Sequence, residues 1–217
     1  MIELVGLARR YGDRTALSGV TVSVPEGATL ALFGSNGAGK TTLLRVLASL
    51  LRPHEGSVSV LGSPLPGEAW KVRSKVGYLG HESLLYRDLT VKQNLEFHRR
   101  LHGAGDVEQA LASVGLERRA NDPVRELSRG MVQRAAVARA TLHDPQLLLL
   151  DEPRANLDPA AADALEPLIG RPSGRTRVIA SHDIEATLGE ADIALGLKQG
   201  RQVFAGKAEA AQVRGLY

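Results

Sequence analysis

The sequence predicts an α/β fold with a mostly parallel sheet, N-terminal antiparallel strands and an inserted helical segment. Short apolar runs alternate with helical patterns on both sides of the chain's centre. A glycine-rich stretch joins one of these strands to the helix after it. Between residues 84 and 145 the pattern is helical throughout, which indicates an insertion into the alternating part.

The first part of the chain is expected to form strands, one helix and further strands. Leucines at helical spacing predict a helix over 41–51, ended by Arg52 and Pro53. Apolar alternation or short apolar runs predict strands over 21–24 (TVSV), 29–33 (TLALF), 56–62 (GSVSVLG) and 75–80 (KVGYLG).

Two capping patterns mark helices in the inserted segment. Thr90 with Gln93, and Asp106 with Gln109, have the spacing of a capping box. After residue 145 the alternation returns, with a strand over 146–151, a helix over 159–170, a strand over 176–182, a helix over 183–191 and a hairpin over 193–206. We therefore expect one domain over 1–217, with 1–83 and 146–217 as the core lobe and 84–145 as an inserted helical lobe.

Composition excludes several classes of protein. The chain of 217 residues has no cysteine, which excludes disulfide frameworks and thiolate zinc sites. The densest apolar run, LLLL at 147–150, is far shorter than the roughly 20 residues of a membrane span. The N-terminus shows no secretory signal pattern. Net charge is +3, the charges are dispersed and aromatics make up 4% of residues, so no direct nucleic-acid contact is expected.

Residues 34–41, GSNGAGKT, match every position of the phosphate-loop pattern between a strand and a helix. Backbone N–H groups of such a loop point at the β- and γ-phosphates, Lys40 adds a positive charge, and the Thr41 hydroxyl can ligate Mg²⁺. We favour this site over a plain glycine-rich turn. The residues expected to bind nucleotide here are Gly34, Ser35, Asn36, Gly37, Ala38, Gly39, Lys40, Thr41 and Thr42.

Polar side chains follow two other apolar strands. A carboxylate at the end of a buried strand is costly unless it holds a metal or water, so Asp151 is the expected Mg²⁺ ligand and Glu152 the expected general base. The alternative for Glu152 is a carboxylate that caps the turn at Pro153. His182 ends the next strand at the same expected sheet edge and is in reach of the γ-phosphate, although a lone histidine there is more often structural.

Two further positions are predicted to contact nucleotide. Tyr11 is expected on a turn before the first core strand, where its ring can stack on a purine; the alternative is a half-buried surface tyrosine. Ser128, in LSRGMVQR, can cap a helix beginning near Met131. With the Gly130 amide and the helix dipole it forms a second anion pocket that lacks a lysine.

The set formed by Tyr11, GSNGAGKT, LSRGM, LLLLDEP, ANLD and His182 resembles the ATP-binding subunit of ABC transporters over essentially the whole chain. The resemblance implies a P-loop NTPase (RecA-like) core that binds ATP and Mg²⁺. It also implies a head-to-tail homodimer, in which Ser128, Arg129 and Gly130 of one copy close over the ATP held by the other, with Asp158 nearby. Integral membrane permease subunits are the implied partners, so the chain would be cytoplasmic and peripheral on the inner (plasma) membrane.

Three positions depart from the family pattern. Arg129 and Met131 stand where the signature has glycine and glutamine, Ala155 stands where a serine is frequent, and His81 replaces a glutamine near the metal and the attacking water. Imidazole is a poorer ligand than an amide oxygen for Mg²⁺, so His81 is expected to hydrogen-bond water and sense nucleotide.

The segments around His81, LTVKQNLEFHRRLHG and LSRGMVQR resemble the haem-exporter ATP-binding subunit of cytochrome c maturation. Three alternatives stay open at this point. The first is the ATP-binding subunit of a drug or lipid exporter. The second is an ABC-type ATPase that acts on nucleic acid or ribosomes without a membrane partner, and the third is a small-molecule kinase that shares only the phosphate loop.

Overall fold

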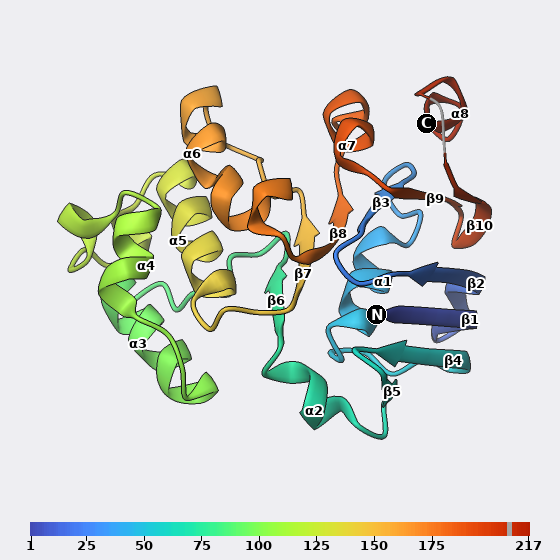
Figure 1. Cartoon of the computed structure of the whole chain (residues 1–217), viewed down its shortest axis with the longest axis horizontal. Coiled ribbons are helices and arrows are strands. Elements are labelled where there is room, and N and C mark those ends of the chain that lie inside the picture. Colours follow the sequence, from blue (N-terminus) through green and yellow to red (C-terminus); the bar gives the residue numbers. More distant parts are fainter. Residues whose placement is uncertain (208–209) are drawn as a thin grey trace.

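The computed structural model describes residues 1–207 and 210–217 (Figure 1). Its strands are β1 (Ile2–Tyr11), β2 (Arg14–Val24), β3 (Thr29–Phe33), β4 (Glu55–Val60), β5 (Ser63–Leu65), β6 (Val76–Leu79), β7 (Leu147–Asp151), β8 (Thr176–Ala180), β9 (Ile193–Lys198) and β10 (Arg201–Gly206). Its α-helices are α1 (Lys40–Leu47), α2 (Ala69–Arg73), α3 (Val91–His102), α4 (Val107–Ser113), α5 (Arg129–Thr141), α6 (Pro159–Ile169), α7 (Ile184–Glu190) and α8 (Ala210–Arg214).

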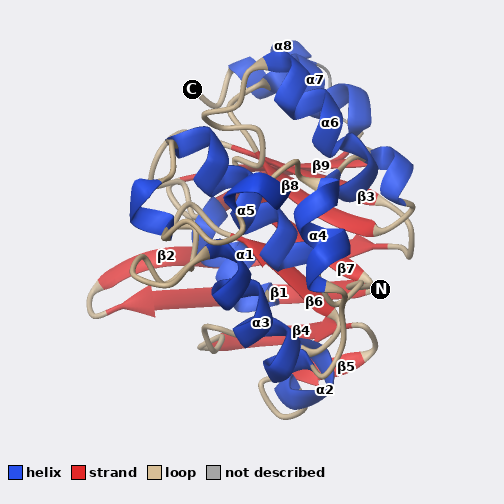
Figure 2. Ribbon diagram, turned by 90° about the vertical axis from the view of Figure 1, so that its left-hand side faces the viewer, coloured by secondary structure: helices blue, strands red, loops and turns tan. Residues whose placement is uncertain are grey.

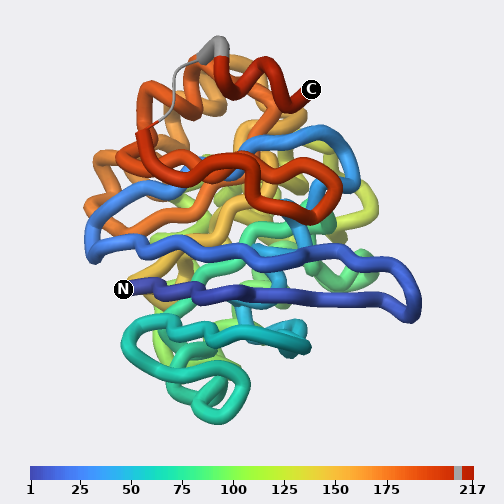
Figure 3. The backbone as a smooth tube through the Cα atoms, turned by 90° about the vertical axis from the view of Figure 1, so that its right-hand side faces the viewer, coloured from blue at the N-terminus to red at the C-terminus, as the bar shows by residue number. Residues whose placement is uncertain are grey.

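The strands form a ten-stranded mixed sheet in the order β5-β4-β1-β2-β10-β9-β3-β8-β7-β6. Strands β9, β3, β8, β7 and β6 are parallel, whereas β5, β4, β1 and β2 are antiparallel. The two parts join where β10 pairs with β2, so the C-terminal hairpin runs beside the N-terminal strands (Figure 3). The expected mixed sheet with N-terminal antiparallel strands is therefore confirmed.

The leucine run of β7 shows how the central strands are covered on both faces. Side chains alternate along a strand, so Leu147 and Leu149 point to one face and Leu148 and Leu150 to the other. The first pair packs in the apolar cluster that contains α1, and the second pair packs in the cluster that contains α5 and α6. In Figure 1, β7 stands between α5 and α6 on its left and α1 on its right, and Figure 2, seen from that left-hand side, shows helices in front of the strands. A continuous apolar run is typical of a strand buried in this way.

Helices α3, α4 and α5 follow β6 and lie at one end of the molecule (Figure 1). Thr90 forms the expected capping box with Gln93, and the Asp106 side chain accepts a hydrogen bond from the Gln109 amide. Ser128 caps α5 as expected, although the helix begins at Arg129 rather than near Met131. The division into a core lobe and a helical lobe over 84–145 stays a prediction.

Several elements differ from the sequence-based expectation. Strand β8 ends at Ala180, two residues before His182, and the expected ranges contain no counterpart of β1, β5, α2 and α8. Helix α1 ends at Leu47 and not at residue 51, because Ser49 adopts a left-handed backbone (φ +58°) and the Leu50 amide bonds back to the Arg45 carbonyl. Strand β2 is longer than 21–24 because it pairs along β1. Tyr11 is the last residue of β1 and pairs with Arg14, so it lies on a strand end and the turn follows it.

The helices were also compared with the requirement for crossing a bilayer. Within residues 1–207 and 210–217, none combines the length and the apolar character that a membrane crossing needs.

Candidate ATP-binding site

A cavity of about 510 Å³ lies where β3, β7 and β8 reach their carboxyl ends. Parallel strands end at the same edge of a sheet, which is where doubly wound folds bind their ligands. The cavity brings together most of the residues predicted from the sequence. Its lining consists of Tyr11, Arg14, Ala16, Asn36, Gly37, Ala38, Gly39, Lys40, Thr41, Thr42, His81, Asp151, Glu152 and His182.

The phosphate loop between β3 and α1 is packed against backbone on two sides. Gly34 (φ +143°) lies so close to the β9 strand that a Cβ atom would stand 2.2 Å from the Leu197 carbonyl oxygen. Gly39 (φ +111°) caps α1, and a Cβ atom there would stand 2.7 Å from the Ala16 carbonyl oxygen. Only glycine fits both positions, which fixes the shape of the loop.

Lys40 begins α1 and is 8% exposed. Its Nζ donates to the carbonyl oxygens of Gly34 (2.5 Å) and Ser35 (3.3 Å), so these two residues orient the ammonium although they do not line the cavity. Burial lowers the pKa of Lys40, while the nearby Glu152 and Asp151 carboxylates act in the opposite direction. The result is a desolvated positive charge at the base of the cavity, which favours an anionic ligand.

Thr41 and Asp151 meet across the cavity floor, where the Thr41 hydroxyl donates to Asp151 Oδ2 at 2.7 Å. Hydroxyl and carboxylate oxygens suit Mg²⁺, which is usually bound by one or two protein oxygens together with phosphate and water. Among the described residues, no cluster of three or more His, Cys, Asp or Glu could hold a metal without such help. The pair therefore fits a Mg²⁺ ion that arrives with a nucleotide.

Glu152 follows β7 and is half-buried, with a left-handed backbone (φ +52°). Its Oε1 has no hydrogen-bond partner among the described residues, and His182 Nε2 stands 3.6 Å from it. The other oxygen, Oε2, accepts a hydrogen bond from the Ser181 hydroxyl at 3.4 Å. Burial raises the pKa of Glu152, with His182 acting in the opposite direction. Glu152 thus lines the cavity and has one buried carboxylate oxygen that makes no hydrogen bond to the described residues.

Tyr11 and His81 line the outer parts of the cavity. Tyr11 is 44% exposed, and the Arg9 guanidinium lies 5.0 Å from its ring centroid. His81 is exposed and also lines a neighbouring groove of about 270 Å³. Of the described residues, His81 alone lines both the cavity and this groove.

Comparison with known proteins decides the family. Residues 17–155 match the family described as "ABC transporter". The chain belongs to the ABC transporter family. It is therefore an ABC-type ATPase with a P-loop NTPase fold.

Relatives of this ABC ATPase include transporter subunits. The "Nod factor export ATP-binding protein I" of Ralstonia nicotianae is 35% identical over 217 residues, which cover 95% of this chain and 67% of that protein. The "Daunorubicin resistance ATP-binding protein DrrA3" of Streptomyces coeruleorubidus is 35% identical over 218 residues, which cover 96% and 68%. The chain thus spans about two thirds of the length of these two relatives.

A solved structure with the same fold shows an ABC cassette as a dimer. It is described as "Dimeric structure of a post-hydrolysis state of the ATP-binding cassette MJ0796 bound to ADP and Pi". Its TM-score is 0.85 at 27% identity, and the match covers 96% of this chain and 99% of that one. The roles of individual residues of this ABC ATPase in ATP binding and in transport stay predictions.

Besides Gly34 and Ser35, four predicted residues lie outside the cavity of this ABC ATPase. Ser128 and Arg129 are exposed at the start of α5, and the Ser128 hydroxyl accepts a hydrogen bond from the Met131 amide at 3.2 Å. Gly130 follows them in the first turn. Asp158 is exposed and caps α6 through the Ala161 amide at 2.9 Å. Within one chain, these residues do not reach the nucleotide site.

The structure adds residues that the sequence did not single out. Arg14 and Ala16 line the cavity from β2, and Ser181 bonds Glu152. The Tyr217 hydroxyl accepts a hydrogen bond from the Gly34 amide at 3.5 Å. A basic residue close to Tyr11 was a usable signal for Arg14. The Tyr217 contact joins residues 183 positions apart and left no local trace in the sequence.

Proposed function

We propose that this ABC ATPase hydrolyses ATP between two copies of the chain and so energises a membrane exporter. The observation that carries the proposal is Glu152 Oε1, a buried carboxylate oxygen without a hydrogen-bond partner among the described residues, at the edge of the cavity that holds Lys40 and Asp151. An unused carboxylate acceptor is what a general base needs, and a water molecule would reach this buried oxygen after a small movement of the Glu152 side chain.

Phosphates of ATP would bind at the start of α1, where backbone amides and Lys40 supply positive charge. Thr41 and Asp151 would hold Mg²⁺, and the ion supplies charge neutralisation on the phosphate oxygens when it is bound. Asn36 and Thr42 line the same cavity and would complete the polar contacts. Tyr11, together with Arg14, would face the base of the nucleotide at the cavity's outer end.

Glu152 would take the proton from the attacking water. His182 stands beside the same carboxylate oxygen, so it would orient that water and contact the γ-phosphate. His81, which also lines the cavity, would respond to nucleotide through water because imidazole is a poor Mg²⁺ ligand. The raised pKa of Glu152 keeps its basicity nearer to neutral pH than that of an exposed glutamate.

Ser128, Arg129 and Gly130 would close the site of a second copy. They sit at an exposed helix start and outside the cavity of their own chain. A head-to-tail dimer would bring this helix start to the partner's γ-phosphate, and Asp158 would lie at the same dimer face. The dimeric, ADP- and phosphate-bound cassette with the same fold supports this arrangement.

The groove beside His81 supports docking of a membrane permease. Arg45, Leu50, Leu84 and Tyr78 line it, and Leu50 and Leu84 are exposed apolar side chains. Leu84 begins the expected helical lobe, so a movement of residues 84–145 relative to the rest of the chain would change this groove, and His81 links the groove to the nucleotide cavity. Such docking would place the chain on the cytoplasmic face of the inner membrane.

The cargo separates two forms of the proposal. The resemblance of the segments around His81 and LSRGMVQR favours haem export. The names of the two relatives, Nod factor export and daunorubicin resistance, favour another kind of exporter. Purification of the chain together with its membrane subunits, followed by an absorption spectrum, separates them. A Soret band that stays with the complex supports haem, and a complex without haem whose ATPase activity rises with a drug supports the alternative.

Glu152→Gln tests the proposed catalytic role. Loss of the base is expected to lower kcat by about 10²- to 10⁴-fold and to leave ATP binding intact. With hydrolysis blocked, ATP is expected to drive the variant into dimers, which sedimentation velocity detects. Glu185→Gln is the matched control, since Glu185 is an exposed carboxylate on α7 that pairs with Arg214 outside the cavity. A native hydrolysis rate in Glu152→Gln would refute the role of Glu152.

A further inference from the structure

The backbone at Glu152 is strained and has to be held by its surroundings. Its φ of +52° lies in the left-handed region, which costs energy for a residue with a side chain. Asn156, four residues later, is also left-handed (φ +63°). A segment with two such residues between β7 and α6 keeps its shape only if other elements fix it.

Two sets of neutral hydrogen bonds hold the start of this segment. The Glu152 amide donates to the Ala180 carbonyl of β8 at 2.8 Å. The Gln133 side-chain amide of α5 donates to the Pro153 carbonyl at 2.9 Å and more weakly to the Glu152 carbonyl at 3.4 Å. These bonds fix the backbone on the sides of β8 and α5, and they leave the side toward α6 and α7 to Arg154.

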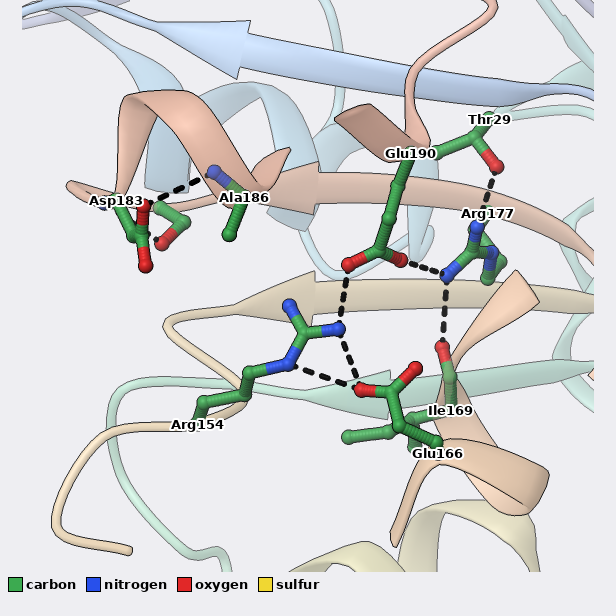
Figure 4. Close-up of polar contacts among 9 residues, drawn as sticks. Thr29, Arg154, Glu166, Ile169, Arg177, Asp183, Ala186 and Glu190 are labelled. Carbon is green, nitrogen blue, oxygen red and sulfur yellow. Dashed lines mark hydrogen bonds and ion pairs between the residues drawn. The ribbon is translucent and has the colours of Figure 1, made fainter. Parts of the chain in front are cut away.

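Arg154 connects the segment to α6 and α7 by ion pairs (Figure 4). Its Nε and Nη2 donate to Glu166 Oε1 of α6 at 3.0 and 2.6 Å. The same Nη2 donates to Glu190 Oε1 of α7 at 2.5 Å. Helix α7 begins directly after His182 and Asp183. Arg154 lies two positions after Glu152, so its ion pair with Glu190 connects the Glu152 segment to the helix that follows His182.

Glu190 in turn is held by a buried arginine. Its Oε2 accepts a hydrogen bond from Arg177 Nη1 at 2.7 Å, and Arg177, the second residue of β8, is 1% exposed. Arg177 also donates to the Thr29 hydroxyl of β3 and to the Ile169 carbonyl (Figure 4). Charges therefore alternate along Glu166, Arg154, Glu190 and Arg177, and each buried charge has an opposite neighbour, which is the arrangement that tolerates burial.

We infer that Arg154 is a positioning residue for hydrolysis, which acts by holding Glu152 and His182 in one fixed geometry. The guanidinium is planar and keeps two donors in a fixed orientation, so it restrains the direction of the segment as well as its distance from α7. A base that is displaced by about 1 Å loses a large part of its effect. This inference rests on the proposed role of Glu152 as the base.

Arg154→Met tests the inference, because methionine keeps much of the side chain's length and removes its charge and donors. We expect kcat to fall by about tenfold to a hundredfold, with KM for ATP close to the native value. Arg154→Lys keeps the charge without the two fixed donors, and it is expected to recover part of the lost kcat. Arg154→Lys also provides the test if Arg154→Met does not fold. A native kcat in Arg154→Lys, together with native ATP-dependent dimer formation, would refute the need for two donors with a fixed orientation.

Arg175→Met is the matched control for a structural effect. Arg175 is also a half-buried arginine, it directly precedes β8, and it pairs with Asp144 and the Leu168 carbonyl away from the cavity. Urea unfolding of both variants shows how much stability each loses. Equal losses of kcat in Arg154→Met and Arg175→Met at equal stability would overturn the inference.

A double-mutant comparison shows whether Arg154 acts through Glu152. In the Glu152→Gln background, we expect Arg154→Met to lower the residual hydrolysis rate by a smaller factor than in the native background, because Glu152, one of the two groups that Arg154 positions, is already removed. A fall by the same factor in both backgrounds would overturn the inference. A native rate in Glu152→Gln alone would refute the proposed base and this inference together, whereas an inactive Glu152→Gln with a native Arg154→Met would refute this inference only.

Discussion

Helices α1 and α5 both begin beside residues that suit an anion, but their first turns are built differently. Helix α1 starts after Gly39, which has no side chain to cap it, and Lys40 adds a buried positive charge. Helix α5 starts after Ser128, whose hydroxyl already accepts the Met131 amide, and its first turn is exposed. The amides of α1 are thus kept for a ligand, whereas those of α5 are partly satisfied within the chain.

From this difference we expect one chain to hold one complete anion site and one incomplete site. A capped, exposed helix start binds an anion weakly because water competes and no lysine contributes. It becomes useful when a second charged surface approaches it. We therefore expect α1 to bind nucleotide in a single chain and α5 to act only when two copies meet.

Lys40→Ala should give the largest effect. Removing a buried, hydrogen-bonded charge from the phosphate site is expected to weaken ATP binding at least about thirtyfold, since such losses cost about 2 kcal/mol or more. Titration of a fluorescent ATP analogue measures the change. Lys71→Ala on α2, an exposed lysine paired with Glu68, is the control. Native affinity in Lys40→Ala would remove the distinction between the two helix starts.

Ser128→Asp tests whether α5 acts on the other copy. Aspartate caps helices as well as serine does, so the fold should persist, but its charge repels a triphosphate. The variant should bind ATP alone and fail to hydrolyse it. When Ser128→Asp is mixed with an equal amount of inactive Lys40→Ala, about half of the dimers should contain one copy of each variant. Each of these mixed dimers has one intact composite site out of two, so hydrolysis should return at about a quarter of all sites.

A second mixture controls this experiment. Lys40 and Glu152 are expected to serve the same nucleotide, so Lys40→Ala mixed with Glu152→Gln leaves no composite site intact. This mixture should stay inactive in the same hydrolysis assay. Recovery in the Lys40 and Glu152 mixture, or none in the Lys40 and Ser128 mixture, would contradict the head-to-tail arrangement.

The pH profile should give the smallest effect and sharpens the properties of the α1 site. Burial raises the pKa of Glu152, so protonation should stop hydrolysis as pH falls, at a higher pH than for an exposed glutamate. Burial also lowers the pKa of Lys40, so KM for ATP should rise on the alkaline side as the ammonium loses its proton. Steady-state kcat and KM from pH 5 to about pH 10 test both arms. A kcat that is constant on the acid side would exclude Glu152 as the titrating base.

Local sequence was sufficient for the central parts of the fold and the site. The phosphate loop, β3, β7 and the Ser128 cap depend on residues a few positions apart, and the structure has them as expected. Because parallel strands end at one edge, the neighbourhood of Lys40, Asp151 and Glu152 also followed from the pattern. The place of Tyr11 on β1 did not, since it depends on pairing between whole strands.

Long-range side-chain contacts were beyond the reach of sequence patterns. Arg154 forms ion pairs with Glu166 and Glu190, which lie 12 and 36 residues later in the sequence. The three residues lie in different elements, so no helical or strand periodicity predicts these contacts. Ser181 could be read as the end of a strand, but its bond to Glu152 depends on the left-handed backbone at Glu152. Such contacts follow from how elements pack, which a single sequence does not state.

The tight packing of Gly34 against Leu197 and of Gly39 against Ala16 has a thermodynamic consequence. Neighbouring strands determine the loop's conformation before any nucleotide arrives, so ordering of this segment belongs to the free energy of folding. Association with phosphate then loses little conformational entropy at this loop. The exposed side chains of Ser128 and Arg129 are not held by neighbouring strands in this way. The entropic cost of ordering them therefore belongs to the free energy of dimer formation.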